Sequence, residues 1–113
     1  MAQSGSLGQF EQLVLTAILA LDADAYGVTI RRKVEELSSP RKVTLGAVYV
    51  TLDRLEDKGF VSSWLTDPTP ERGGRAKRCY KLEGSGESAL RDSMIAARRM
   101  WNAMPKRWSK AWD

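Results

Sequence analysis

The chain of 113 residues contains no histidine and only one cysteine, and these absences exclude several functions. Acid–base or nucleophilic catalysis by histidine is impossible without that residue. A zinc site is not expected, because zinc in proteins is bound mainly by cysteine and histidine. One cysteine cannot form an intramolecular disulfide, which is consistent with a reducing compartment. We therefore expect a cytoplasmic protein that is not an enzyme and that needs no metal or other cofactor.

Long apolar runs and a targeting signal are also lacking. The longest apolar run covers residues 13–21, is interrupted by Thr16, and is too short to cross a membrane. The first six residues are neutral and polar, unlike a signal peptide. We expect no membrane partner, one compact domain, and a disordered N-terminus over residues 1–7.

Basic residues are concentrated in two places. The net charge of the chain is +4, yet residues 68–81 and residues 98–113 each carry +4 by themselves. The rest of the chain therefore carries −4. This separation of charge is typical of proteins that bind nucleic acid, although it does not prove such a partner.

Apolar periodicity and turn residues predict a definite order of helices and strands. Helices are expected over residues 8–22, 25–38, 45–58 and 86–104, and strands over residues 60–66 and 76–82. The loop between the strands holds two prolines, a glycine pair and basic residues. Three helices, a strand, a basic loop and a second strand form a winged helix-turn-helix, which is a mainly helical α+β fold. We assign residues 8–83 to a DNA-binding domain, 84–105 to a dimerisation helix and 106–113 to a basic tail with tryptophans.

The third predicted helix, residues 45–58, has an unusual outer face. Thr44 is a good N-cap, and Gly59 suits the left-handed turn that ends a helix. The buried stripe consists of Leu45, Val48, Leu52 and Leu55, and the open face of Gly46, Ala47, Val50, Thr51 and Arg54. A small, neutral surface lets a helix approach the major groove of DNA closely. An ordinary amphipathic helix would show the same pattern, but the basic loop that follows favours DNA binding.

The candidate DNA contacts have roles that follow from their chemistry. Arg54 is the best candidate to hydrogen-bond a base edge, while Gly46 permits close approach of the backbone. Loop cations suit phosphates rather than bases. The predicted contacts near bases are Gly46, Ala47, Val50, Thr51 and Arg54, and the predicted backbone contacts are Lys42, Thr44, Arg72, Arg75 and Lys77. A solvated hairpin with chance basic residues is the alternative interpretation of the loop.

The last predicted helix has the apolar spacing of a coiled coil, with gaps of 4, 3, 4 and 3 residues. The first helix is apolar on more than one side, so a second subunit would cover its extra face. The predicted residues of a homodimer interface are Leu15, Leu19, Leu90, Met94, Ala97, Trp101 and Met104. Trp101 there can stack on a planar ligand, although most such tryptophans only pack. The tail 106–113 can fray, touch DNA or fold back onto the dimer, and the sequence does not choose.

Most of the chain, about residues 7–90, resembles the PadR family of transcriptional regulators. The motifs that carry this resemblance are Leu13-Val14-Leu15, Ala25-Tyr26-Gly27, Leu45-Gly46-Ala47-Val48-Tyr49, Arg54-Leu55-Glu56, Gly59-Phe60-Val61 and the wing from residue 68 to 82. The resemblance implies a dimeric winged-helix protein, often a repressor, whose C-terminal helix serves dimerisation. Some members bind aromatic small molecules at the dimer interface.

The resemblance also implies that Tyr49 lies close to DNA. Two residues depart from the family pattern. Cys79 stands where the family usually has an aromatic residue, and Glu83 where a threonine commonly caps the last helix. Neither residue bears on the predicted DNA contacts.

Taken together, these features predict a homodimeric, sequence-specific DNA-binding regulator. Its two-fold symmetry predicts a pseudo-palindromic operator in double-stranded DNA. We expect a repressor, and a small aromatic effector at Trp101 would be the ligand that relieves it. The alternative is a winged-helix module that binds another protein and never DNA, but a docking surface gains little from a strongly basic loop.

Overall fold

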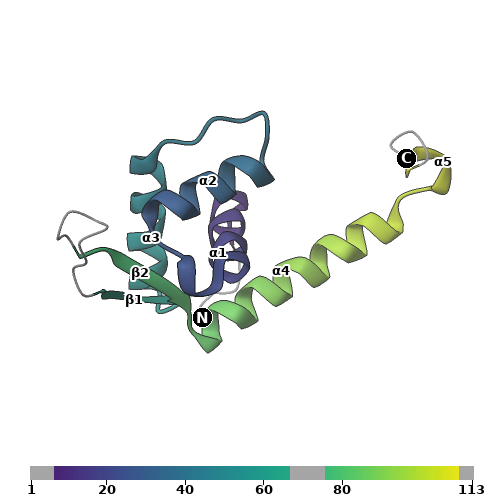
Figure 1. Ribbon diagram of the computed structural model, residues 1–113. Coiled ribbons are helices and arrows are strands. Elements are labelled where there is room, and N and C mark those ends of the chain that lie inside the picture. Colours follow the sequence, from purple (N-terminus) through teal and green to yellow (C-terminus); the bar gives the residue numbers. More distant parts are fainter. Residues whose placement is uncertain (1–6, 67–75, 110–113) are drawn as a thin grey trace.

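A computed structural model of the chain describes residues 7–66 and 76–109 (Figure 1). Its elements in chain order are α1 (Gln9–Leu21), the 3-10 helix η2 (Asp22–Asp24), α2 (Gly27–Leu37), α3 (Leu45–Asp57), β1 (Val61–Leu65), β2 (Arg78–Leu82), α4 (Gly84–Ala103) and α5 (Lys106–Ser109). The four expected helices and two expected strands all form, and α5 is a short addition in the tail. The predicted wing contacts Arg72 and Arg75 lie outside the described residues, as do residues 1–6.

Helices α1, α2 and α3 pack around one apolar core and form the head of the molecule (Figure 1). The largest fully buried side chains come from all three helices and are Val14, Leu15, Ile18, Ile30, Val34, Val48, Leu52 and Leu55. Full burial of each such side chain contributes about 1.5–3 kcal/mol relative to leaving it in water. The three helices therefore hold one another through this shared core.

Local signals set the ends of α3. The Thr44 side chain accepts a hydrogen bond from the Ala47 amide at 3.1 Å, as expected of an N-cap. At the other end, Gly59 has φ +80°, a left-handed conformation that favours glycine. Both predicted capping residues are confirmed, so the start and the end of α3 are set by residues of the chain itself.

The two strands form an antiparallel hairpin beside α3, with Val61 opposite Leu82 and Trp64 opposite Cys79. The Tyr80 amide donates to the Ala25 carbonyl at 2.9 Å, which joins β2 to the start of α2. The hairpin thus extends from the head as a wing whose base is fixed to the same helices that present α3.

The prediction that residues 1–7 are disordered was wrong for Leu7. Its side chain is buried in the core, and its carbonyl accepts a hydrogen bond from Gln12 Nε2 at 3.2 Å. Burial of the apolar Leu7 side chain is favourable, so Leu7 packs on the core together with α1, unlike what was expected from the polar residues before it.

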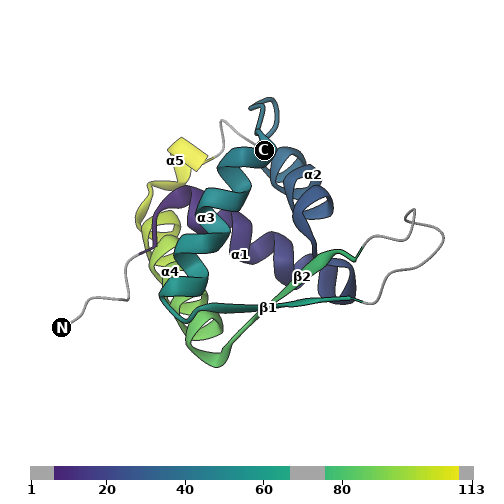
Figure 2. The same cartoon turned by 90° about the vertical axis from the view of Figure 1, so that its left-hand side faces the viewer.

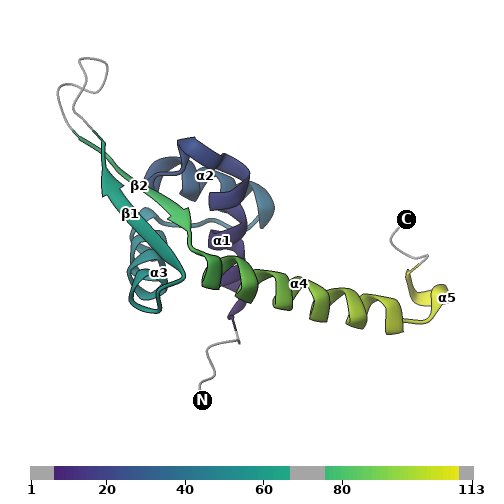
Figure 3. The ribbon, with the colours of Figure 1, turned by 90° about the horizontal axis from the view of Figure 1, so that it is seen from below.

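Helix α4 starts on the head and then leaves it (Figures 1 and 3). Its first turn lies so close to β1 that a Cβ at Gly86 would collide with the Phe60 carbonyl. Ala89 and Leu90 are buried, whereas nearly all of residues 91–104 are exposed. The molecule is accordingly elongated, with extents of 56 × 36 × 21 Å.

Two predicted interface residues are buried inside the single chain. Leu15 has no exposed surface, and Leu90 has almost none. Helix α1 contacts α2, α3, α4 and β2 of its own chain, and Leu15 is fully buried among these elements. Their placement in a dimer interface is therefore corrected, while Leu19 does remain exposed.

Candidate nucleic-acid interface

Helix α3 lies in front of α1, on the side of the head that faces the viewer in Figure 2, and its first turns expose small side chains. Gly46 and Ala47 are exposed, and Val50 is 59% exposed. A Cβ placed on Gly46 would meet no atom within 4 Å, so the backbone at the start of α3 is accessible. A surface of this shape can fit against the floor of a groove, because no long side chain keeps the helix axis away.

Thr51, which was expected on this face, is instead 4% exposed. It lies three residues after Val48 and four before Leu55, so it belongs to the buried stripe by helical spacing. A base contact from Thr51 is excluded by this burial, and the open face is narrower than the sequence analysis assumed.

Tyr49 lies at the edge of the open face, against the first residue of α2. A Cβ at Gly27 would be 2.6 Å from Tyr49 Cζ and would also collide with the hydroxyl oxygen. The tyrosine ring thus occupies space that only glycine leaves free. Burial raises the pKa of the neighbouring Tyr80, and the proximity of Tyr49 adds to that shift. Tyr49 itself remains partly exposed, with its ring beside the start of α2.

Arg54 and Lys58, at the end of α3, share one buried acid of α1. Glu11 Oε2 lies 2.9 Å from Lys58 Nζ and 3.9 Å from Arg54 Nη1. Glu11 Oε1 accepts a hydrogen bond from the Gly8 amide at 3.0 Å. Burial acts to raise the pKa of Glu11, but the Gly8 amide and the two cations outweigh it, so the pKa is lowered. The carboxylate is therefore ionised at neutral pH and pairs with the two cations at the end of α3.

Sequence reasoning missed Glu11 as a functional residue. The signal available was local, because an acid three residues after an N-cap often bonds the N-cap amide. Its contact with Lys58 spans 47 residues of sequence and becomes visible only in the fold.

At the base of the wing, side chains are tied to the helices. Lys77 Nζ lies 3.8 Å from the centre of the Tyr26 ring, which is a close cation–π contact. Arg78 Nη1 donates to Ser63 Oγ at 3.0 Å, and Ser63 Oγ donates to Glu56 Oε2 at 2.8 Å. The wing strands are thereby joined to the end of α3, which limits how the wing can move relative to that helix.

Lys42 and Thr44 are both exposed just before α3 begins. Between them, the Val43 amide donates to Glu35 Oε2 at 2.9 Å, and this hydrogen bond is the main reason why the pKa of Glu35 is lowered. The connector that carries Lys42 is thus held to α2 by this hydrogen bond.

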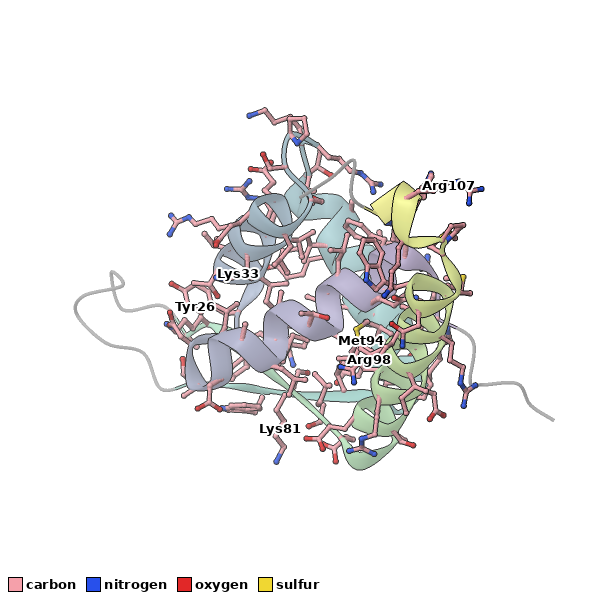
Figure 4. The ribbon with its side chains drawn as sticks, turned by 90° about the vertical axis from the view of Figure 1, so that its right-hand side faces the viewer. Tyr26, Lys33, Lys81, Met94, Arg98 and Arg107 are labelled. Carbon is pink, nitrogen blue, oxygen red and sulfur yellow. The ribbon has the colours of Figure 1, made fainter. Side chains whose placement is uncertain are left out.

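Helix α4 presents a different kind of open face. Long apolar side chains are exposed along its outer half, namely Met94, Ile95, Met100, Trp101 and Met104. Figure 4 shows Met94 and Arg98, one turn apart, on the side of α4 next to α1. An open groove of about 390 Å³ lies between the two helices and is lined by Leu19, Glu87, Leu90, Arg91 and Met94.

None of the helices in the described part of the chain is long and apolar enough to cross a membrane.

Three packed helices that present the third outward, followed by a two-stranded wing, define a winged helix-turn-helix protein, as predicted. The chain matches the PadR-like family of transcriptional regulators over residues 14–92, more than half of its length, and it belongs to that family. It is therefore a DNA-binding transcription regulator and not an enzyme.

Several solved structures share this architecture. The H. salinarum protein RosR is 28% identical, with a TM-score of 0.70, over 96% of this chain and 90% of RosR. A PadR-like transcription factor from Bacteroides fragilis is 27% identical, with a TM-score of 0.67, over 84% of this chain and 85% of that protein. The ORC1 protein of Aeropyrum pernix, solved in complex with DNA, is 26% identical, with a TM-score of 0.64, over 84% of this chain and 26% of ORC1. A comparison with curated proteins found no match.

Proposed function

We propose that the chain is a cytoplasmic repressor that binds a pseudo-palindromic operator as a homodimer. The observation that carries this proposal is the outer face of α3, whose first two turns expose the small, uncharged residues Gly46, Ala47 and Val50 while basic residues flank them. Bases are reached in the major groove, and phosphates lie on either side of that groove. A helix with small residues in the middle and cations at its margins matches this distribution.

Base contacts are assigned to the open face of α3. Ala47 and Val50 are suited to apolar contact with a thymine methyl group, and Gly46 to close approach of the backbone. Arg54 is the residue assigned to hydrogen-bond a base edge, for which a guanine offers two acceptors. Tyr49, at the edge of the face, is assigned to a phosphate through its hydroxyl group.

Backbone contacts are assigned to residues on both sides of α3. Lys42 and Thr44 precede the helix and are exposed. Lys77, held over the Tyr26 ring, supplies a cation at the base of the wing, and Arg72 and Arg75 are assigned to the wing from their charge alone. Charges of this kind bind any sequence, so they supply affinity and register more than selectivity.

Dimerisation is assigned to α4. Met94, Trp101 and Met104 expose large apolar side chains on an arm that leaves the head, and Ala97 lies between them at heptad spacing. Leu19 of α1 extends the same apolar surface through the groove that it shares with Met94. Two copies related by a two-fold axis would read half-sites one helical turn apart or a multiple of it.

An aromatic effector at the dimer interface would bind beside Trp101. A planar ligand stacked on an indole changes its fluorescence, so titration of flat aromatic compounds into the protein tests the idea. A Trp101→Phe variant separates this signal from the other three tryptophans. A response that persists in Trp101→Phe would contradict the assignment.

The decisive experiment measures binding to two fluorescent duplexes across a salt series, one from the promoter of its own gene and one of random sequence. Tight, salt-dependent binding to the promoter with much weaker binding to the random duplex supports a specific regulator. A promoter reporter then separates a repressor from an activator. Equal binding to both duplexes would contradict sequence selectivity, and binding to neither would favour the protein–protein module instead.

A further inference from the structure

Glu11 is a buried acid of α1 that contacts two cations at the end of α3. Only 7% of the residue is exposed, and its two oxygens have separate partners. Oε1 accepts the Gly8 amide at 3.0 Å, and Oε2 accepts Lys58 Nζ at 2.9 Å. Arg54 Nη1 approaches the same Oε2 at 3.9 Å. Burying a carboxylate is costly unless it is paired, so both cations lower the free-energy cost of burying this acid.

The contact with Arg54 leaves much of the guanidinium free. The Arg54 side chain is 52% exposed even with Nη1 beside Glu11. A guanidinium has five N–H donors in one rigid plane. When one edge of this plane faces a carboxylate, the plane is restrained, and its other edge can still donate two hydrogen bonds outward.

We propose that Glu11 is a positioning residue that holds Arg54 in the orientation from which it reads a base edge, an inference that rests on the proposed function of Arg54. In this arrangement Arg54 contacts its base without leaving Glu11. The proposal also holds that a phosphate contact, to the side of the groove, turns the guanidinium away from Glu11 and breaks the ion pair.

This difference between the two contacts is what makes Glu11 relevant to selectivity. An ion pair that had to break for every DNA sequence would weaken all binding equally and would add no discrimination. An ion pair that is kept in the base contact and lost in the phosphate contact penalises only non-specific binding. Lys58 takes the short hydrogen bond at 2.9 Å, so the Arg54 contact at 3.9 Å orients the guanidinium without fixing its exact position.

The test uses the full chain and a duplex selected from a random library by the wild-type protein. Glu11→Gln keeps an oxygen to accept the Gly8 amide but removes the charge that restrains Arg54. We expect the ratio of affinities for the selected and random duplexes to fall about tenfold, within the range that one arginine–base contact supplies. We also expect the salt dependence on random DNA to rise by about one unit, because Arg54 becomes a free phosphate contact.

The matched control is the same substitution in an Arg54→Ala background. There, Glu11→Gln should leave the affinity ratio unchanged, since no guanidinium remains to be positioned. An equal loss of affinity on both duplexes, or an effect that persists without Arg54, would overturn the proposal in favour of a purely structural role. A wild-type chain that selects no sequence would overturn the proposed function, and the positioning role with it.

A second variant keeps the test decisive if Glu11→Gln folds poorly with Lys58 left unpaired. Glu11→Gln combined with Lys58→Met removes the unpaired cation and still releases Arg54. The affinity ratio should again fall about tenfold, with thermal unfolding close to that of the wild type. A folded double variant with full selectivity would overturn the proposal.

Discussion

Helices α3 and α4 each have one face that no other described residue covers, and the two faces differ in the size and polarity of their side chains. The first two turns of α3 expose the small residues Gly46, Ala47 and Val50, whereas the apolar residues exposed on the outer half of α4 include long methionine and tryptophan side chains. Burial of apolar surface gains about 25 cal/mol per Å², so the face of α4 has much to gain from a protein partner. The face of α3 has little apolar area to bury and instead offers a close fit to a polar groove.

The two helices also differ in how they are held. Helix α3 packs on α1, α2 and β1, and its ends are set by Thr44 and Gly59. Helix α4 is anchored through its first turns, where Gly86 meets Phe60 and Leu90 enters the core. The comparison teaches that α3 is set in place by its own chain, while the outer half of α4 leaves its apolar side chains exposed within the described part of the chain.

The largest effect is expected from replacing Met94 and Ala97 with aspartate. Two charges on the apolar face should convert dimers to monomers, as measured by light scattering. Operator affinity should fall at least about 100-fold, because two linked half-site contacts become separate binding events. Ile95→Asp is the control, since Ile95 is equally exposed but lies outside the heptad spacing. Dimers that persist in the double variant would show that α4 is not the interface.

A charge on the face of α3 should break DNA binding without affecting the dimer. Ala47 occupies the third position after the N-cap Thr44, where a glutamate stabilises a helix. Ala47→Glu should therefore keep or slightly raise the unfolding temperature while weakening binding about 10- to 100-fold through repulsion from phosphates. Ala47→Gln, which has the same size without the charge, separates repulsion from bulk. Full affinity in Ala47→Glu would exclude this face from the interface.

Local signals made the position of α3 predictable, and distant contacts made the details of its surface unpredictable. Thr44 and Gly59 mark its ends in the sequence itself. Thr51 was predicted on the open face, but it is buried. Its spacing from Val48 and Leu55 fits the buried stripe as well, and the prediction did not use that spacing. Glu11 acts on Lys58 across 47 residues, and no local pattern indicates that contact.

Helix α4 also shows that contacts between distant parts of the chain could not be predicted from the sequence. The heptad spacing predicted a helix with one apolar face, which the structure contains. Leu15 and Leu90 were assigned to a second subunit, yet their own chain buries them. Which apolar residue is covered by which element depends on the packing of α1 among four neighbours, and periodicity within one helix carries no such information.

A smaller effect is expected from Gly27→Ala, which tests how α3 is fixed to α2. The added methyl group must displace the Tyr49 ring, so the phosphate contact assigned to Tyr49 should be lost, with affinity falling about tenfold on every sequence. In a Tyr49→Ala background the ring is gone, and Gly27→Ala should cost nothing further in a binding titration. Additive losses in the two variants would mean that Gly27 acts independently of Tyr49.

The smallest effect concerns acid, and it tests the ion pairs that anchor the end of α3 to α1. The pKa of Glu11 is lowered in the folded chain, so its ion pairs stabilise the fold above the ordinary glutamate pKa of about 4.3. This contribution is lost as the pH falls through the lowered pKa. Glu35, whose pKa is also lowered, acts in the same direction, so the comparison must be with Glu11→Gln. Thermal unfolding measured from pH 6 to about pH 3 should fall less steeply for Glu11→Gln than for the wild type. Parallel curves would mean that Glu11 does not link α1 to the end of α3 in solution.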